Sequence, residues 1–400
     1  MKKFGVLDCF CSVKGVEKGE QTRLAVGRPE EKQISCGGGH SRAESVRKSI
    51  KQIKIMGKAI FHSSIEGGQH GPKGLDGFLA FAKQSGAAGA QPTCYMLEDG
   101  KGGFKSAAEV KAACEKYGLK LDGISCHCVT WVLGTAWTGS KTMLPFLSSE
   151  VGKKSAPEIE LWAEDYLKKL MDLAAELKVF VLPMFWGVSF GWELATGYPW
   201  GFFKAGYDLI KEGQERFIKQ SAAVRKYANE RGIYLAHEIH PGTAACCADD
   251  FNMLVDICDG DKCLTVNADP SHCWEGEDWE TRFTKVGDRV IGCHVKNHVV
   301  HKGMPLRSME ADWKKRAMQF TDLSTGDLNM VRYAELMEKI GYARRYCQVM
   351  GTTTAPLVVE AESAYRDGDA TSANGIQYVA KDLCFPMAEG SFEDGLGAQD

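Results

Sequence analysis

The chain has 400 residues, of which 44% are hydrophobic and 25% charged, and its formal net charge is −3. This composition is typical of a globular protein that buries a large core, and the weak negative charge argues against a nucleic-acid partner, because phosphate binding needs a basic surface. No run approaches the roughly 18 consecutive apolar residues of a membrane-spanning helix, so we also expect no membrane partner.

The cysteines indicate a reducing compartment. Fifteen are present, singly or in close pairs such as Cys126 and Cys128, without the C-x-x-C spacing of a zinc ribbon. In a chain of this length they are typical of reduced, mostly buried thiols. The first residues, MKKFGVLDCFCSVKG, show no small-residue cleavage pattern of a secretory signal. We therefore expect a cytoplasmic protein.

In chain order, the sequence begins with residues 1–53, which are polar and punctuated by glycine and predict an N-terminal extension. The remainder, 54–400, is expected to form one domain with a C-terminal tail. From about residue 57, short apolar runs alternate with longer segments of helical periodicity. The predicted strands are 58–65, 87–97, 119–128, 179–187, 233–242, 263–274, 289–298 and 355–363.

This alternation predicts a (β/α)8 TIM barrel, because strands separated by helices run parallel and eight such units can close into a ring. A doubly wound open sheet is the alternative, but no strand is followed by G-x-G-x-x-G. Residues 188–212 are too long for a simple turn and are rich in aromatic residues. We interpret them as an insertion after the fourth strand, on the face where barrel active sites form.

The ends of the predicted strands carry most of the histidines and several acids. In chain order these residues are His62, His127, Glu238, His240, Asp269, His272, His294, Lys296, His298, Glu360 and Glu362. The carboxyl ends of barrel strands meet on one face, and acids rarely point into a barrel unless they are paired or bound to metal. Two glutamates, an aspartate and a histidine from successive strands suit a divalent ion, Mn²⁺ or Mg²⁺ first and Co²⁺ or Zn²⁺ next.

Four segments, LAHEIHPG, NADPSHCWEG, CHVKN and VVEAE, resemble in this order the motifs of the xylose isomerase-like superfamily of sugar phosphate isomerases and epimerases. The resemblance covers about residues 57–385, and its specific part lies in the last four strands. It implies one divalent metal ion bound by Glu238, Asp269, His294 and Glu360, and the donor set makes Mn²⁺ the expected ion. It also implies that His272 contacts substrate hydroxyls.

The resemblance implies a metal-dependent sugar isomerase or epimerase with a small carbohydrate as its substrate. A metal that bridges two adjacent oxygens of a hydroxy-ketone acidifies the intervening C–H and stabilises the enediolate. Glu238 and Glu360 would remove and return the proton. The residues expected to bind substrate are His272, His240, Lys296, His62, His127 and Trp186.

One position departs from the family pattern. The ketose epimerases of this superfamily carry an arginine six residues beyond the metal-binding histidine, and this chain has Val300 there. Arg307 and Lys296 are the candidate replacements. Glu362 shares a strand face with Glu360 and competes with it as a ligand.

Several alternatives remain open. The same site would serve a lyase or dehydratase acting on a keto-sugar, a keto-glycoside or an inosose. In an aldolase, Lys296 would form a Schiff base with the substrate. A repair endonuclease would need more metal ligands and a basic groove. A non-catalytic sugar-binding protein would need neither of these two features. A homo-oligomer is also left open.

Three further interpretations concern the surroundings of the site. The segment HSSIEGGQHGPKG is expected to be a substrate loop, with His62 and Glu66 facing the pocket. His298 and His301 are expected to be solvated loop residues. The aromatic cluster is either the core of the insertion or a wall that stacks on sugars, and it comprises Phe185, Trp186, Trp192, Tyr198, Trp200 and Phe202.

Overall fold

The computed structural model describes residues 59–135, 147–187 and 209–386. The predicted N-terminal extension and most of the insertion after the fourth strand lie outside these ranges, as does the end of the C-terminal tail. The division into extension and barrel therefore stays a prediction.

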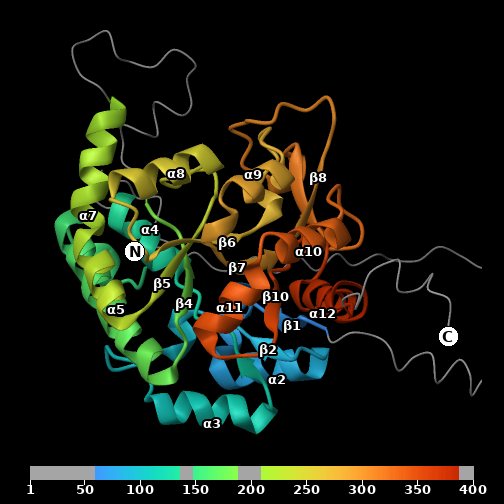
Figure 1. The fold of residues 1–400 in the computed structure, drawn as a ribbon, viewed down its shortest axis with the longest axis horizontal. Coiled ribbons are helices and arrows are strands. Elements are labelled where there is room, and N and C mark those ends of the chain that lie inside the picture. The colour runs from blue at the N-terminus through green and yellow to red at the C-terminus, as the bar shows by residue number, and fades with distance from the viewer. Residues whose placement is uncertain (1–58, 136–146, 188–208, 387–400) are drawn as a thin grey trace, which may run out of the picture. The chain divides into compact units, whose positions relative to one another are not determined.

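Eight parallel strands form the barrel (Figure 1). They are β1 (Phe61–Ile65), β2 (Gly89–Ala90), β3 (Lys120–Leu121), β4 (Val181–Met184), β5 (Tyr234–Glu238), β6 (Leu264–Ala268), β7 (Val290–Val295) and β10 (Ala355–Val359). Six of them pair in the order β1-β10-β7-β6-β5-β4, and β2 pairs with β3.

Backbone hydrogen bonds close the ring on both sides of the short β2–β3 pair. The amide of Gln91 donates to the carbonyl of Ile65 at 2.8 Å, which joins the end of β2 to β1. The amide of Cys126 donates to the carbonyl of Pro183 at 2.9 Å, which joins the segment after β3 to β4. The predicted (β/α)8 barrel is confirmed.

Helices surround the sheet (Figure 1). They are α2 (Gly74–Ser85), α3 (Ala107–Tyr117), α4 (His127–Thr135), α5 (Ala156–Leu177), α7 (Leu209–Arg231), α8 (Ala248–Ile257), α9 (Trp279–Lys285), α10 (Met330–Lys339), α11 (Tyr342–Met350) and α12 (Gly368–Tyr378). Capping boxes at Ser106 and Ser155 start α3 and α5, because each serine and the glutamate three residues later satisfy the free amides of the first turn. None of the described helices is long and apolar enough to cross a bilayer.

The connection between β7 and β10 differs from the prediction. The predicted strand 289–298 bends after Val295, and a hairpin of β8 (Asn297–Val300) and β9 (Met318–Thr321) follows. Asn297 anchors this hairpin, since its amide nitrogen donates to the carbonyls of Leu323 and Leu328. Gly341, whose φ of 76° favours glycine, separates α10 from α11.

The described cysteines are free thiols, and all of them are buried or half-buried. This agrees with the prediction of reduced thiols packed as small apolar side chains.

Candidate active site

Four side chains converge at the carboxyl ends of the last four parallel strands. They are Glu238 at the end of β5, Asp269 just after β6, His294 in β7 and Glu360 just after β10. One potential ligand atom from each lies within 4.8 Å of all the others. His294 is central, because its Nδ1 lies 3.1 Å from Oε2 of Glu238 and 2.7 Å from Oε2 of Glu360. The structure thus brings together all four residues predicted as metal ligands.

Neighbouring polar groups fix the orientation of these side chains. Asn267 donates a hydrogen bond from Nδ2 to Oε2 of Glu238 at 2.9 Å. The backbone amide of Ser271 donates to Oδ1 of Asp269 at 2.8 Å, because Asp269 caps the short 3-10 turn that begins at Pro270. Both carboxylates are therefore held in place before any ligand binds.

The imidazole of His294 is oriented in the same way from its other side. Its Nε2 lies 2.8 Å from Oε1 of Gln91, an oxygen that can only accept a hydrogen bond. This contact leaves Nδ1 facing Glu238 and Glu360. An acceptor on the far nitrogen is the usual partner of a metal-binding histidine.

Opposite charges in the cluster shift one another's pKa values. Burial alone would raise the pKa of Glu238, but its contacts with His127, His272 and His294 hold that pKa well below its usual range. Burial would lower the pKa of His294, and the carboxylates of Glu238 and Glu360 instead raise it well above its usual range. In this arrangement a protonated imidazole supplies the positive charge that the carboxylates require.

The donor set fits a divalent cation. Oδ2 of Asp269 is buried and has no hydrogen-bond partner among the described residues, although it lies 3.4 Å from Nε2 of His272. A buried carboxylate oxygen without a partner is costly, and a cation would satisfy it. Three carboxylates and one imidazole form the mixed oxygen and nitrogen set that hard or borderline divalent ions prefer.

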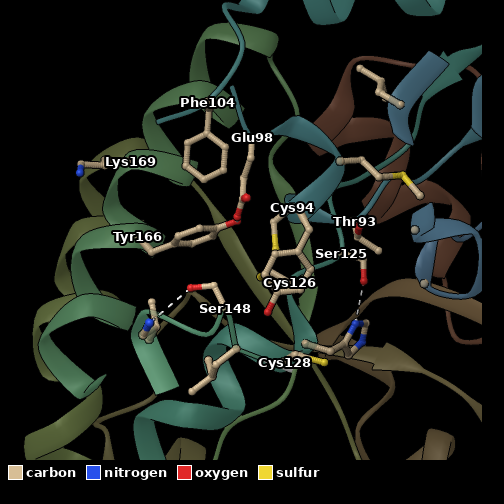
Figure 2. Close-up of a pocket in the computed structure, with 18 of the residues that line it drawn as sticks. Thr93, Cys94, Glu98, Phe104, Ser125, Cys126, Cys128, Ser148, Tyr166 and Lys169 are labelled. Carbon is tan, nitrogen blue, oxygen red and sulfur yellow. Dashed lines mark hydrogen bonds between the residues drawn. The ribbon is translucent and has the colours of Figure 1, made fainter. Parts of the chain in front are cut away.

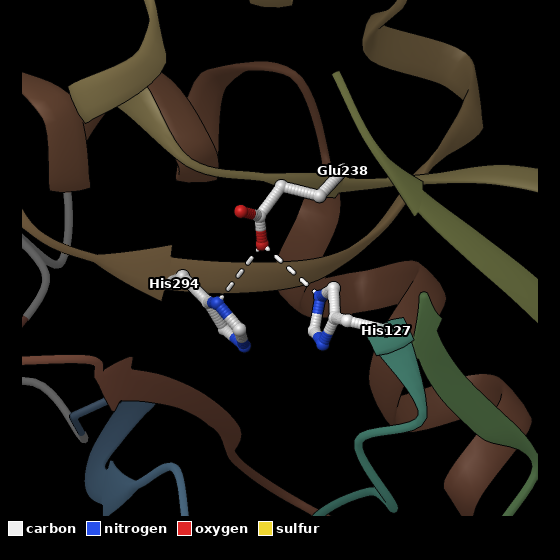
Figure 3. Close-up of side chains that lie close together, drawn as sticks. All are labelled: His127, Glu238 and His294. Carbon is white, nitrogen blue, oxygen red and sulfur yellow. Dashed lines mark ion pairs between the residues drawn. The ribbon is translucent and has the colours of Figure 1, made fainter. Parts of the chain in front are cut away.

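Three histidines predicted to bind substrate lie beside this cluster. Nε2 of His127 is 3.4 Å from Oε2 of Glu238, on the side opposite His294, as Figure 3 shows. Nε2 of His272 lies 3.1 Å from Oε1 of Glu238, and the ring of His240 packs on that of His272 with centroids 4.0 Å apart. His127, Glu238 and His294 also form a second set whose ligand atoms lie within 4.8 Å of one another.

Lys296 is buried between two carboxylates. Its Nζ lies 2.9 Å from Oε1 of Glu360 and 2.7 Å from Oε2 of Glu362. The ammonium also lies 4.1 Å from the ring centroid of Phe320, which the β8–β9 hairpin contributes. Glu362 therefore pairs with Lys296 and is not one of the four clustered acids and imidazoles.

Of the two candidate replacements for the family's arginine, the structure brings only Lys296 to the cluster. Arg307 is exposed and pairs with Glu275, with 3.1 Å between Nε and Oε1.

The structure does not bring His62, predicted to bind substrate, to the cluster. His62 lies near the start of β1, not at its end, and its Nε2 is 3.0 Å from Oδ2 of Asp122. Its Nδ1 is 2.9 Å from the hydroxyl of Thr354, which precedes β10, so the pair lies at the opposite end of the barrel. Glu66, just beyond β1, instead lines the cavity above the cluster.

The structure places Phe185, and not Trp186, along the cavity. The Trp186 ring packs edge-on against Phe217 of α7, with centroids 5.5 Å apart, so it faces the surrounding helices. Phe185 points to the cavity, and its ring lies 4.5 Å from that of His127 and 4.8 Å from that of His240. Alternation along the segment after β4 puts neighbouring side chains on opposite faces.

The structure also describes the two histidines that were expected to be solvated, but not most of the aromatic cluster. His298, expected to be solvated, is only 4% exposed, because it lies in β8 at the root of the hairpin; His301 is exposed as expected. Trp192, Tyr198, Trp200 and Phe202 lie outside the described residues.

Sequence reasoning missed Gln91, Asn267 and Phe320. Asn267 lies two residues before Asp269, so alternation along β6 could have identified it. Gln91 follows a strand of only two residues, and Phe320 belongs to a hairpin that was not predicted. Neither position carries a sequence signal.

Comparisons with solved structures support the fold. The chain resembles a xylose isomerase-like TIM barrel protein from Mycobacterium smegmatis in complex with magnesium, with 17% identity, a TM-score of 0.52, and coverage of 82% of this chain and 99% of that one. It also resembles the probable 3-DHS dehydratase AsbF from Bacillus anthracis, with 14% identity, a TM-score of 0.52, and coverage of 80% and 100%.

A third similar structure is the 3-keto-D-glucoside 4-epimerase YcjR from E. coli in its apo form, with 13% identity, a TM-score of 0.52, and coverage of 80% and 98%. At these identities the likeness establishes the fold alone. No curated protein matches the sequence.

The sequence itself matches a family model described as "Xylose isomerase-like TIM barrel" over residues 79–368. That range spans most of the barrel, from α2 to the start of α12. The chain therefore belongs to the xylose isomerase-like TIM barrel family.

Proposed function

We propose that the protein is a divalent-metal-dependent isomerase or epimerase of sugars, with Mn²⁺ as the preferred ion and Mg²⁺, Co²⁺ or Zn²⁺ as alternatives. The convergence of Glu238, Asp269, His294 and Glu360 within 4.8 Å carries this proposal. The names of two similar structures support it, one an epimerase of a keto-glucoside and the other a complex with magnesium.

The four clustered residues would hold the ion. When bound, the ion would supply Lewis-acid stabilisation of negative charge that develops on substrate oxygen. Gln91 and Asn267 hold His294 and Glu238 in the required orientation, as their contacts at 2.8 and 2.9 Å indicate.

Glu238 and Glu360 are the proposed acid/base pair. They approach His294 from two different strands, β5 and β10, which lie on opposite sides of β7 in the sheet. One carboxylate would take the proton from carbon, and the other would return a proton at the opposite face or at the neighbouring carbon. Lys296 and His272 would donate hydrogen bonds to substrate oxygens, and Phe185 would cover the apolar face of the sugar.

The contacts of Lys296 argue against a Schiff-base aldolase. A nucleophilic lysine must be neutral, and two carboxylates within 2.9 Å of Nζ favour the charged ammonium.

A repair endonuclease is disfavoured by the net charge of −3. We also propose that the protein is cytoplasmic, and a homo-oligomer remains compatible with this function.

A lyase or dehydratase remains the second candidate, because the similar structures include a probable dehydratase and both reactions begin by removing a proton next to a carbonyl. The test follows deuterium from solvent. Protein loaded with Mn²⁺ is incubated in D₂O with ketohexoses, 3-keto-glycosides and inososes, and the products are examined by NMR and mass spectrometry.

We expect deuterium incorporation at a carbon next to the carbonyl, without loss of water or an aglycone. Elimination would replace the isomerase assignment with a lyase. No incorporation into any of these compounds would contradict both.

Replacing Gln91 with leucine is expected to weaken Mn²⁺ binding by about 10–100-fold, the usual effect of losing the partner that orients a ligating histidine. Calorimetric titration of metal-free protein measures this. Gln319→Leu is the matched control, because Gln319 is equally buried but its amide nitrogen binds backbone carbonyls in the β8–β9 connection. Equal Mn²⁺ affinity in wild type and Gln91→Leu would contradict the role given to Gln91.

A further inference from the structure

The cavity above the candidate active site extends well beyond it. Its volume is about 1370 Å³, whereas pockets for small ligands usually hold about 300–1,000 Å³. One end is formed by Glu66, His127, Glu238 and Glu360. The other end lies over the connection between β2 and α3 and over the N-terminal half of α5, and the proposed proton transfer uses none of its residues.

Aromatic rings form this far end, which we call the aromatic subsite and define as Tyr95, Glu98, Phe104, Trp162 and Tyr166. Tyr166 is central, with its ring centroid 5.0 Å from Phe104, 5.2 Å from Trp162 and 6.4 Å from Tyr95. Its hydroxyl donates to Oε1 of Glu98 at 2.8 Å. Figure 2 shows Phe104, Tyr166 and Glu98 close together beside the cavity.

The wall that carries Glu98 and Phe104 is held in a fixed shape. Glu98 and Phe104 form an antiparallel β-bridge on either side of a turn. Within the turn, the backbone amides of Lys101 and Gly103 donate hydrogen bonds to Oδ1 of Asp99. The ammonium of Lys105 donates to the carbonyl of Met96 at 3.1 Å, which ties the turn to the segment before it. The subsite is therefore formed before a ligand binds, which lowers the entropy cost of binding.

Hydrogen bonds join the aromatic subsite to the candidate active site. The amide of Cys94, next to Tyr95, donates to the carbonyl of Ser125 at 2.8 Å. The hydroxyl of Ser125 lies 2.8 Å from Nδ1 of His127, whose other nitrogen faces Glu238. A ligand that reaches from Glu238 to Tyr95 would thus lie along one continuous wall.

We propose that the aromatic subsite binds a second sugar ring, so that the substrate is a keto-glycoside of disaccharide size and not a free ketohexose. This inference rests on the proposed function and names its substrate class. The C–H faces of a pyranose pack on aromatic rings, while its hydroxyls donate to acceptors at the edge. Glu98 meets this need, because a carboxylate offers about four acceptor sites and Tyr166 occupies one.

Binding tests the subsite independently of turnover. The full chain loaded with Mn²⁺ is titrated calorimetrically with cellobiose, maltose and trehalose, and with methyl β-D-glucopyranoside as the single-ring reference. We expect at least one disaccharide to bind about ten-fold more tightly than the reference, and Trp162→Ala and Glu98→Ala to remove this advantage.

Two controls are matched to these variants. Trp279→Ala removes a half-buried tryptophan that packs on Tyr333 at the other side of the barrel, and Glu115→Ala removes an exposed glutamate of α3. Both should retain the advantage of the disaccharide, and thermal unfolding confirms that each variant is folded. If no disaccharide binds more tightly than the reference, or if the controls lose as much affinity as the subsite variants, the proposal is overturned. If only phenyl β-D-glucopyranoside bound more tightly than the methyl glucoside reference, the proposal would also be overturned, because the subsite would then bind an aryl group and not a sugar ring.

Turnover separates this inference from the proposed function. Deuterium incorporation is compared between D-fructose and the 3-keto derivatives of the same disaccharides. We expect kcat/KM to be at least ten-fold higher for a keto-disaccharide, and Trp162→Ala and Glu98→Ala to lower that value by a larger factor than they lower the value for D-fructose. Equal values for both compounds, unaffected by these variants, would overturn the subsite and leave the isomerase standing. No incorporation from any compound would overturn the isomerase, and the binding titrations would then decide the subsite alone.

Discussion

Replacing Asp269 with asparagine is expected to lower the affinity for Mn²⁺ by more than about 100-fold, beyond the roughly 10–100-fold effect of losing an orienting partner. Oδ1 of Asp269 accepts a hydrogen bond from the amide of Ser271, whereas Oδ2 is buried and has no hydrogen-bond partner in the part of the chain that the structure describes. Asparagine can keep the bond to Ser271, but it removes the negative charge that a divalent ion requires. The measurement is metal content after Mn²⁺ supplementation, together with calorimetric titration of the metal-free protein.

Asp122→Asn is the matched control for this prediction. Asp122 and Asp269 are both 2% exposed, but Asp122 pairs with His62 at the opposite end of the barrel. Its replacement should lower the temperature of thermal unfolding and leave Mn²⁺ binding unchanged. Equal metal content in wild type and Asp269→Asn would contradict the metal site itself.

The part of the site that could be predicted lies on the longest strands. β5, β6, β7 and β10 are each five or six residues long and almost entirely buried, so the point where each apolar run ends is visible in the sequence. In β6, Pro270 ends the strand and Asp269 caps the turn that follows, which fixes the position of the carboxylate. Strand length, together with a local signal that ends the strand, allowed the carboxyl ends of these four strands to be predicted from the sequence.

The positions of His62 and Trp186 differ from those expected because strand ends and side-chain directions were ambiguous in the sequence. His62 was placed at the end of β1, but the strand continues through Ser63 and Ser64 to Ile65. Phe185 and Trp186 are adjacent aromatic residues after a short strand, so a shift of one residue exchanges the ring in the cavity with the ring in the core. Hydrophobicity alone does not distinguish the two.

Other features depend on contacts between distant segments. β2 and β3 have two residues each and show no alternation, so nothing marked Gln91 as the partner of His294. Trp162 and Tyr166 are spaced like ordinary helix residues that pack on a core. Their role in the aromatic subsite is visible only because the turn that carries Phe104 lies against α5.

Replacing Glu360 or Glu238 with glutamine is expected to slow deuterium exchange into substrate by about 10²–10⁴-fold, the usual contribution of a positioned acid or base. Glutamine has nearly the shape of glutamate but does not accept a proton at neutral pH. Each variant also loses a ligand charge, so the exchange rate is measured at saturating Mn²⁺ and divided by the metal content of the same sample. A loss of exchange rate that remains after this correction is due to impaired proton transfer.

Glu362→Gln is the control that separates the two glutamates of the VVEAE segment. Glu362 shares Lys296 with Glu360, at 2.7 and 2.9 Å from Nζ, but only Glu360 belongs to the four-residue cluster. Glu362→Gln should therefore slow exchange by less than about ten-fold, because Lys296 keeps its contact with Glu360. An equal loss in Glu360→Gln and Glu362→Gln would mean that Lys296, which both carboxylates hold, is the group that the reaction requires. Full exchange in Glu238→Gln at full metal content would remove Glu238 from the acid/base pair and leave it only as a ligand.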